Sequence, residues 1–236
     1  MLKLAAIFIL AASSVLHADT QTPSSFSGDF VIKVNYRYLL SKPEGYDADK
    51  DKKWPLVVFL HGSGERGTDL ELIKKHGPPK LVAAGQKFPA IVASLQCEPN
   101  NLWNPHAVQA VTEHLVKTLR VDPKRVYLTG ISMGGFGTWE TAFEYPETYA
   151  AIAPICGGAG VRWVTAQRLK SMPCWIFHGD KDGAVPIENS QKIYDALKKI
   201  DAPVKFTIYP GVGHDSWTQT YANPEFWSWL FEQKKP

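Results

Sequence analysis

The chain has 236 residues, of which 44% are hydrophobic and 21% are charged, and its formal net charge is +3. This composition is that of one globular domain with a sizeable core, and it argues against a disordered chain. The small net charge and the lack of a Lys- or Arg-rich block argue against a nucleic-acid partner.

The first 18 residues have the pattern of a signal peptide. Lys3 supplies a positive charge, residues 4–16 are mostly apolar, and the small Ala18 marks a cleavage point. The alternative interpretation is a buried first helix. The apolar run is too short to cross a bilayer, so no membrane span is predicted. We therefore expect a secreted or periplasmic protein in which residues 19–236 form one domain.

Apolar runs typical of strands alternate with segments of helical periodicity along the rest of the chain. In chain order, the pattern predicts a strand at 30–40, a strand at 55–60, a helix at 69–84 capped by Thr68 or Asp69, a strand at 89–95, a helix at 106–119, a strand at 125–128, a helix at 134–143, a strand at 149–155, a short helix at 164–169, a strand at 174–177, a helix at 187–200, a strand at 204–209 and a helix at 224–231. This alternation predicts an α/β fold, with a mostly parallel sheet and helices on both faces. The segment between the strands at 149–155 and 174–177 is too short for a lid domain.

Ser132 is the most informative residue, because it stands in the sequence G-I-S-M-G at 130–134, directly after the strand at 125–128. The glycines at both ends of this motif allow a sharp strand-to-helix turn that exposes the serine hydroxyl. The motif therefore predicts a nucleophilic serine.

A serine hydroxyl needs a base, and the base needs a carboxylate that holds its tautomer. His214 is the predicted base, since it lies in a glycine-containing loop after the last strand. Asp182 is the predicted acid, in the loop after the strand at 174–177; Asp180 is its rival, and Asp215 is expected to point elsewhere. The chain order Ser, Asp, His is that of an α/β-hydrolase fold.

The other histidines have different expected roles. His61 and His178 each precede a glycine at a strand end, and we expect them to hydrogen-bond within their loops and shape them. His17 falls in the signal peptide. Three more are expected to be surface or helix residues without a catalytic role: His76, His106 and His114.

A tetrahedral intermediate also needs hydrogen-bond donors for its oxyanion. The backbone N–H of Met133, next to the serine, is one candidate. The second is the N–H of Ser63, with Gly64 close behind, in the glycine-rich loop at 61–67. We expect Arg66 of this loop to pair with a carboxylate.

The same loop matches G-x-G-x-x-G at 62–67, which is also a dinucleotide-binding fingerprint. Here Glu65 and Arg66 crowd the place of a pyrophosphate, so no cofactor is expected. Cys97 and Cys156 each follow a strand and could share one edge of the sheet, which leaves a disulfide between them open. Cys174 begins a strand and is not expected to pair, and no spacing indicates a metal site.

Together these motifs resemble a known group of enzymes. The resemblance lies in the segments 61–67, 96–97, 130–135, 154–158, 178–186 and 213–214. They are similar to secreted bacterial α/β-hydrolases of the phospholipase/carboxylesterase and feruloyl-esterase-like type, a group that includes predicted peptidases of the prolyl-oligopeptidase clan. The resemblance implies that Asp182 rather than Asp180 is the triad acid, and that Ser63 and Met133 form the oxyanion hole.

The resemblance further implies a secreted hydrolase of carboxylic esters, with small acyl, feruloyl or acetyl esters, including those on plant cell-wall carbohydrate, as substrates. A serine peptidase of the same fold is the alternative. A binding module that has kept only the scaffold is disfavoured, because serine, acid and base are all present. Of the eight tryptophans, Trp103 and Trp217 lie in or near strand-end loops and are candidates for substrate contact.

Overall fold

The computed structural model describes residues 24–29, 31, 33 and 35–236. The chain divides into a unit up to Ile32 and a compact unit from Lys33 to Pro236, and the described strands and helices belong to the second unit. The predicted signal peptide at 1–18 lies outside the described residues. So do positions 30, 32 and 34 of the predicted first strand, whose described part begins as a strand only at Arg37.

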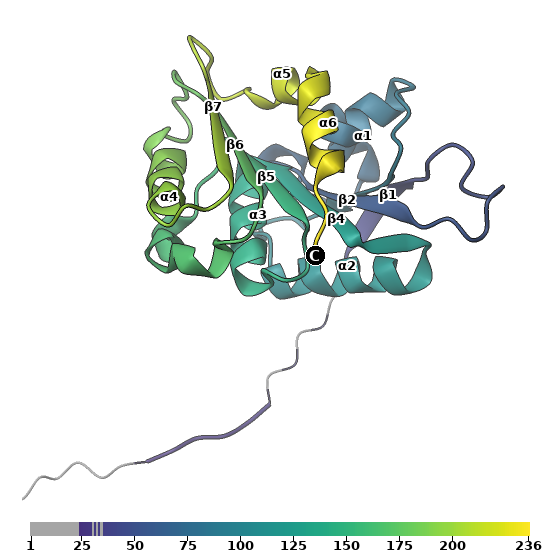
Figure 1. Ribbon diagram of the computed structural model, residues 1–236, viewed down its shortest axis with the longest axis horizontal. Helices are drawn as coiled ribbons and strands as arrows, with labels where there is room; N and C mark the ends of the chain where they lie inside the picture. The colour runs from purple at the N-terminus through teal and green to yellow at the C-terminus, as the bar shows by residue number, and fades with distance from the viewer. Residues whose placement is uncertain (1–23, 30, 32, 34) are drawn as a thin grey trace, which may run out of the picture. The chain divides into compact units, whose positions relative to one another are not determined.

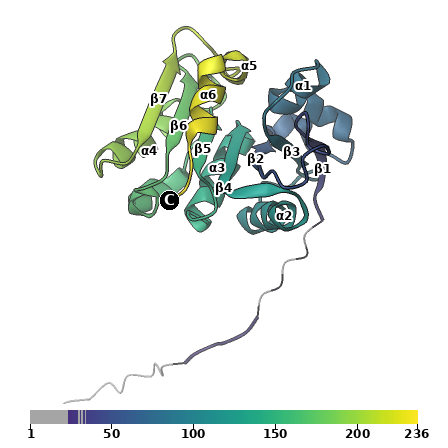
Figure 2. The ribbon, with the colours of Figure 1, turned by 45° about the vertical axis from the view of Figure 1, so that its right-hand side comes forward.

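A seven-stranded sheet forms the centre of this unit. Its strands are β1 (Arg37–Ser41), β2 (Trp54–Leu60), β3 (Ile91–Gln96), β4 (Val121–Ile131), β5 (Ala151–Ile155), β6 (Cys174–Gly179) and β7 (Val204–Tyr209). They lie side by side in the order β1-β3-β2-β4-β5-β6-β7 (Figure 2). β1 pairs antiparallel with β3, and the other neighbours pair in parallel, which confirms the mostly parallel sheet.

Helices cover both faces of the sheet, as predicted (Figure 1). On one face lie α1 (Gly77–Ala83), α5 (Trp217–Ala222) and α6 (Pro224–Glu232). On the other lie α2 (Pro105–Thr118), α3 (Met133–Glu144) and α4 (Glu188–Lys198). Short 3₁₀ helices complete the described elements: η1 (Ser63–Glu65), η2 (Leu70–Lys75) and η3 (Gly160–Leu169).

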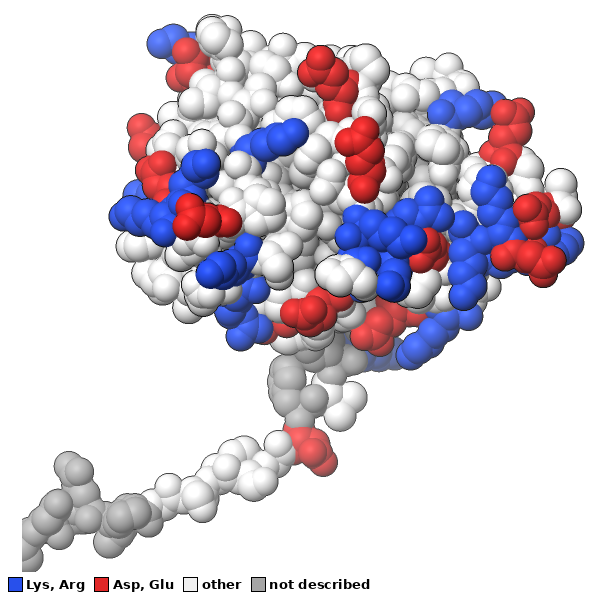
Figure 3. All heavy atoms as spheres, in the orientation of Figure 1, with Lys and Arg blue, Asp and Glu red and all other residues white. Residues whose placement is uncertain are grey.

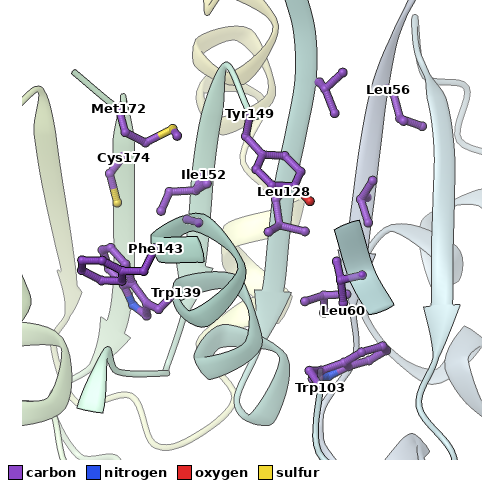
Figure 4. Close-up of a cluster of buried hydrophobic side chains, with 14 of the residues drawn as sticks. Leu56, Leu60, Trp103, Leu128, Trp139, Phe143, Tyr149, Ile152, Met172 and Cys174 are labelled. Atoms are coloured by element: carbon purple, nitrogen blue, oxygen red, sulfur yellow. The ribbon is translucent and has the colours of Figure 1, made fainter. Parts of the chain in front are cut away.

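The strand β2 shows why the sheet is covered twice. All seven of its residues are buried, and successive side chains of a strand point to opposite faces. Val57 and Phe59 join the core under α1, α5 and α6, while Leu56 and Leu60 join the core under α2, α3 and α4. Figure 4 shows part of this second core, with Trp139 of α3 among its large side chains.

The predicted helix at 69–84 is wrong, because two short helices, η2 and α1, occupy this segment. Asp69 caps the first, since its side chain accepts a hydrogen bond from the N–H of Glu71 at 3.0 Å. The break falls at Gly77, whose φ of +64° is the left-handed region that favours glycine. A Cβ atom on this glycine would lie 2.6 Å from the ring of Phe59, so the close packing of α1 on β2 also requires glycine there.

A second difference lies near the C-terminus. The sequence pattern predicts no helix in the polar segment after His214, yet this segment forms α5 at Trp217–Ala222. Its buried side chain Tyr221 faces the sheet, and the hydroxyl of Tyr221 lies 2.8 Å from that of Thr129 on β4. Tertiary contact, rather than periodicity, therefore defines this helix.

The connection between β5 and β6 contains η3 and no larger insertion. Arg162 of η3 forms ion pairs with two residues of α3, Glu140 at 2.5 Å and Glu144 at 2.7 Å. These pairs hold the connection against α3. The segment is thus a short, anchored crossing, in agreement with the predicted absence of a lid domain.

Charged side chains of both signs are interspersed over the face of the molecule drawn in Figure 3. Within the residues that the structure describes, no helix has the length and apolar character needed to cross a membrane.

The turn between β4 and α3 is pressed against the end of β2. A Cβ atom on Gly134 would lie 2.0 Å from the carbonyl oxygen of Leu60, and one on Gly130 would lie 2.3 Å from the carbonyl oxygen of Gly134. Real Cβ atoms do not approach backbone so closely. Both positions therefore require glycine for reasons of space.

We expect Gly134→Ala to lower the free energy of unfolding by about 1–3 kcal/mol, because the added methyl group forces backbone atoms apart. Gly64→Ala is the matched control, since a Cβ atom there would meet nothing within 4 Å. Urea denaturation followed by circular dichroism measures both variants. Equal stabilities for the two would contradict the steric account of the turn.

Candidate functional site

Ser132 sits at the turn between β4 and α3 in a strained backbone conformation. Its φ is +52° and its ψ is −118°, which a residue other than glycine adopts only when its surroundings impose it. The N–H of Ser132 donates to the carbonyl of Ile155 on β5 at 2.9 Å. The predicted strand-to-helix turn is thus present, and it holds the serine at the carboxyl edge of the sheet.

Two loops from the same edge meet this serine. His214 follows β7, and its Nε2 lies 2.9 Å from Ser132 Oγ. Asp182 follows β6, and its Oδ2 lies 2.7 Å from His214 Nδ1. Since a carboxylate accepts hydrogen bonds, Nδ1 carries the hydrogen and Nε2 can accept from the serine hydroxyl. The structure therefore brings together all three predicted residues of the triad.

The carboxylate of Asp182 is held by its own turn. Its Oδ1 accepts from the N–H groups of Ala184 at 2.9 Å and Val185 at 2.8 Å, and its side chain has no exposed surface. Burial acts to raise the pKa of Asp182, but hydrogen bonds from His214, Val185 and Ala184 outweigh it, and the pKa lies below its usual value. This group is therefore ionised at neutral pH.

The rival carboxylates hold loops together. Asp180 Oδ1 accepts from the N–H of Gly211 at 2.6 Å, which ties the loop after β6 to the loop after β7. Asp215 accepts from the N–H and the hydroxyl of Thr218 at 3.0 and 2.8 Å, at the start of α5. Asp182, by contrast, contacts His214 directly.

The candidate oxyanion donors lie on either side of Ser132. Met133 is the first residue of α3, where a backbone N–H has no acceptor within the helix. Ser63 opens η1, directly after Gly62, and a Cβ atom on that glycine would lie 3.7 Å from Ser132 Cβ. The loop backbone thus passes close to the serine. Gly64, the alternative donor, is the next residue of the same turn.

A cavity of about 570 Å³ opens beside Ser132. It is lined by Ser63, Arg66, Leu102, Trp103, Ser132, Met133, Phe136, Gly137 and Glu140. Four of these belong to α3 and follow the i, i+3, i+4, i+7 spacing, so one face of the helix forms a wall. The cavity is mainly apolar beside the serine, with one positive and one negative side chain among its lining residues.

Trp103 also lines the cavity, but the N–H of its ring is already hydrogen-bonded within the protein. Its side chain packs edge-on against the ring of His61, with ring centroids 4.9 Å apart, and its Nε1 donates to the carbonyl of His61 at 3.0 Å. Only 6% of the residue is exposed. Trp103 therefore presents an apolar surface to the cavity and no hydrogen-bond donor.

Trp217 lies against the predicted base. Its ring is perpendicular to that of His214, with centroids 5.3 Å apart, and its Nε1 donates to His76 Nδ1 at 3.2 Å. The side chain of His76 is 32% exposed, as expected of a surface residue, and its Nε2 also lies 3.8 Å from the buried carboxylate of Glu65. These contacts join residues far apart in the chain, and the local sequence around His76 gives no sign of them.

The predicted pairing of Arg66 with a carboxylate is wrong. Its Nε donates to the carbonyl of Ser63 at 3.0 Å, and its Nη1 to the carbonyl of Asn101 at 3.4 Å. Arg66 therefore fixes the loop through backbone oxygens. A sequence does not reveal such partners, since every residue has a carbonyl.

The loop-shaping roles predicted for two histidines are confirmed. His61 Nε2 accepts from the N–H of Cys97 at 3.0 Å and its Nδ1 lies 2.6 Å from the carbonyl of Gly62. Burial lowers the pKa of His61 to about 4, so the ring is neutral. His178 contacts Ser190 Oγ at 2.8 Å and the carbonyl of Val185 at 2.9 Å.

The three cysteines are free and buried. Cys97 follows β3 and Cys156 follows β5, and β2 and β4 lie between those strands. Three strand spacings amount to roughly 14 Å, which a disulfide cannot bridge. Figure 4 shows Cys174 in the core beside Met172 and Ile152.

Cys156 lies next to the predicted triad. Among the described residues, its sulfur, a carboxylate oxygen of Asp182 and a ring nitrogen of His214 are all within 4.8 Å of one another. Burial raises the pKa of the Cys156 thiol to about 12, so this group keeps its proton and stays uncharged at neutral pH. It therefore adds no charge to the site.

The chain is similar in sequence and in fold to known hydrolases. The family model of the dienelactone hydrolase family matches residues 97–225, more than half of the chain and a span that includes all three triad candidates. A solved structure titled as a thermostable esterase is 38% identical, with a TM-score of 0.74, over 85% of this chain and 60% of that chain. The predicted resemblance to esterase-type α/β-hydrolases is confirmed.

Two further likenesses are more distant. A solved ferulic acid esterase shares the fold, with a TM-score of 0.65 and 18% identity over 83% of this chain and 93% of that chain. An uncharacterized secreted protein of Arthroderma benhamiae is 22% identical over 73% of this chain and 23% of its own length. The chain spans less than half the length of the first curated relatives that it matches.

Proposed function

Since the chain belongs to the dienelactone hydrolase family, we propose that it hydrolyses carboxylic esters through an acyl-enzyme on Ser132. The observation that carries the proposal is the hydrogen-bonded series from Asp182 to His214 at 2.7 Å and from His214 to Ser132 at 2.9 Å. The similarity to an esterase at 38% identity supports the same class of reaction.

The chemistry follows from this geometry. His214 Nε2 takes the hydroxyl proton while Ser132 Oγ attacks the ester carbonyl, and the ionised Asp182 stabilises the imidazolium that forms. The N–H groups of Ser63 and Met133 are the proposed donors to the oxyanion. His214 then protonates the leaving alcohol, and a water molecule, activated by the same imidazole, releases the acid.

The cavity beside Ser132 favours an acyl group with apolar or aromatic character. Phe136, Leu102 and Trp103 supply apolar surface, and a volume of about 570 Å³ has room for a feruloyl group as well as for an acetyl group. Without a lid domain, the site is open to esters on a polymer such as plant cell-wall carbohydrate. We propose these esters as the substrate class.

We also propose that the protein is secreted or periplasmic after cleavage near Ala18. The charged and apolar pattern of residues 1–18 supports this, as does the likeness to a fungal protein described as secreted. The exported protein is then expected to begin near residue 19, which N-terminal sequencing of the protein from the culture medium or periplasm measures. A mature protein that retains residues 1–18 would contradict the proposal.

Ser132→Ala is expected to reduce turnover of p-nitrophenyl acetate and methyl ferulate by about 10⁴-fold or more, because no nucleophile remains. Ser171→Ala, at an exposed serine, is the matched control and should keep wild-type rates. A proline-containing peptide tests the alternative peptidase function. Near wild-type activity in the Ser132 variant would refute the nucleophile, and cleavage of the peptide without any ester would refute the substrate class.

Phe136→Ala tests the acyl pocket. Removal of this apolar wall should lower kcat/KM for methyl ferulate by about tenfold or more, since a bulky acyl group loses buried contact. The rate with p-nitrophenyl acetate should change much less, because an acetyl group has little apolar surface to bury. Val161→Ala, at a residue of η3 that is 80% exposed, is the control. Equal losses on the two substrates would place the acyl group elsewhere.

A further inference from the structure

His178 is a fully buried histidine beside the triad that the proposed mechanism does not use. It lies near the end of β6, four residues before Asp182, and it has no solvent-exposed side-chain surface. Its two ring nitrogens have three polar neighbours within hydrogen-bonding or ion-pair distance, plus a fourth reached through Ser190. Because water does not reach the ring, these neighbours decide which nitrogens carry hydrogens.

The Nε2 atom faces two acceptors. It lies 2.9 Å from the carbonyl oxygen of Val185 and 3.2 Å from Oδ2 of Asp182. A carbonyl oxygen has no hydrogen to donate, and an ionised carboxylate has none either. Nε2 of His178 must therefore carry a hydrogen.

The Nδ1 atom faces a hydroxyl whose own hydrogen is already engaged. Ser190 Oγ lies 2.8 Å from Nδ1 and also 2.8 Å from the carbonyl oxygen of Gly157. Since that carbonyl can only accept, the hydroxyl hydrogen belongs to this contact, and Oγ accepts from the ring. Every contact is satisfied only when Nδ1 also carries a hydrogen.

We propose that His178 is a positively charged positioning residue, which clamps the 182–185 turn and shares the Asp182 carboxylate with His214. This inference rests on the proposed function. A buried cation is costly unless an anion lies beside it, and the carboxylate at 3.2 Å meets that requirement. The clamp acts through Val185, whose carbonyl accepts from His178 while its N–H donates to Asp182.

The position of Asp182 between two histidines affects the protonation of His214 in one direction. Oδ2 of Asp182 lies 2.7 Å from His214 Nδ1 and 3.2 Å from His178 Nε2. Because both rings face the same carboxylate oxygen, the positive charge of His178 opposes protonation of His214. Among the described residues, other titratable groups around the triad include the uncharged thiol of Cys156, Asp215, and the pair His76 and Glu65 beyond Trp217.

His178→Gln removes the positive charge but keeps a side-chain amide that can donate to Val185. We expect the acidic limb of the kcat/KM profile for p-nitrophenyl acetate to move upward by about one pH unit, so that the rate at the foot of the limb falls about tenfold further than the rate at the plateau. His114→Gln, at an exposed position of α2, is the matched control and should leave the limb in place. A limb that stays put in a His178→Gln protein of wild-type stability overturns the proposal.

A second measurement does not depend on folding of that variant or on catalysis. In ¹⁵N NMR spectra of the full chain carrying Ser132→Ala, both ring nitrogens of His178 should have the shifts of protonated nitrogens at neutral pH. The signal is assigned by its loss in the protein that also carries His178→Gln or, if that protein does not fold, His178→Asn. One unprotonated ring nitrogen would overturn the proposal, whether or not Ser132 is the nucleophile.

Discussion

The site depends on a steric constraint where three backbone segments meet. The carbonyl of Leu60, at the end of β2, touches the turn between β4 and α3 so closely that only glycine fits at positions 130 and 134. This packing imposes the positive φ of Ser132, a strain of about 1–3 kcal/mol that the surrounding sheet must offset. Because the loop at 61–67 starts at the same carbonyl, the contact that forms the turn also brings Ser63 beside it.

The proposed acid and the proposed base are held in different ways. Asp182 is fixed by N–H groups of its own turn, and its side chain has no exposed surface. The side chain of His214 is 28% exposed and is held by Asp182, by Ser132 and by the ring of Trp217. Trp217 is in turn held by His76, so the outer side of the base depends on a residue of the segment that links η2 to α1. This difference suits the proposed roles, because the proposed base must exchange protons with substrate whereas the proposed acid only holds it in place.

Those parts of the site that depend on local geometry can be predicted from the sequence. Glycine spacing predicts the turn at Ser132, and alternating strands and helices predict which loops share the edge of the sheet that holds Asp182 and His214. The sequence could not predict contacts that have no local pattern. The partners of Arg66 are backbone carbonyls, and His76 meets Trp217 across 141 positions of the chain. The break at Gly77, by contrast, does have a local signal, because Pro78 and Pro79 begin α1 and lack the N–H groups that would continue a helix from η2.

Helix α3 links the proposed nucleophile to the cavity beside it. Its N-terminus fixes Ser132 and the N–H of Met133, and one of its faces lines the cavity at Met133, Phe136, Gly137 and Glu140. Gly137 must be small, because a Cβ atom there would lie 2.6 Å from Trp103, whereas Phe136 lines the cavity with a partly exposed side chain. A substitution at position 136 can therefore alter the cavity without disturbing the strained turn. The turn depends instead on the backbone contacts at Gly130 and Gly134. Glu140, the last of these lining residues along α3, forms an ion pair with Arg162 of η3. This pair joins the rim of the cavity to the connection between β5 and β6.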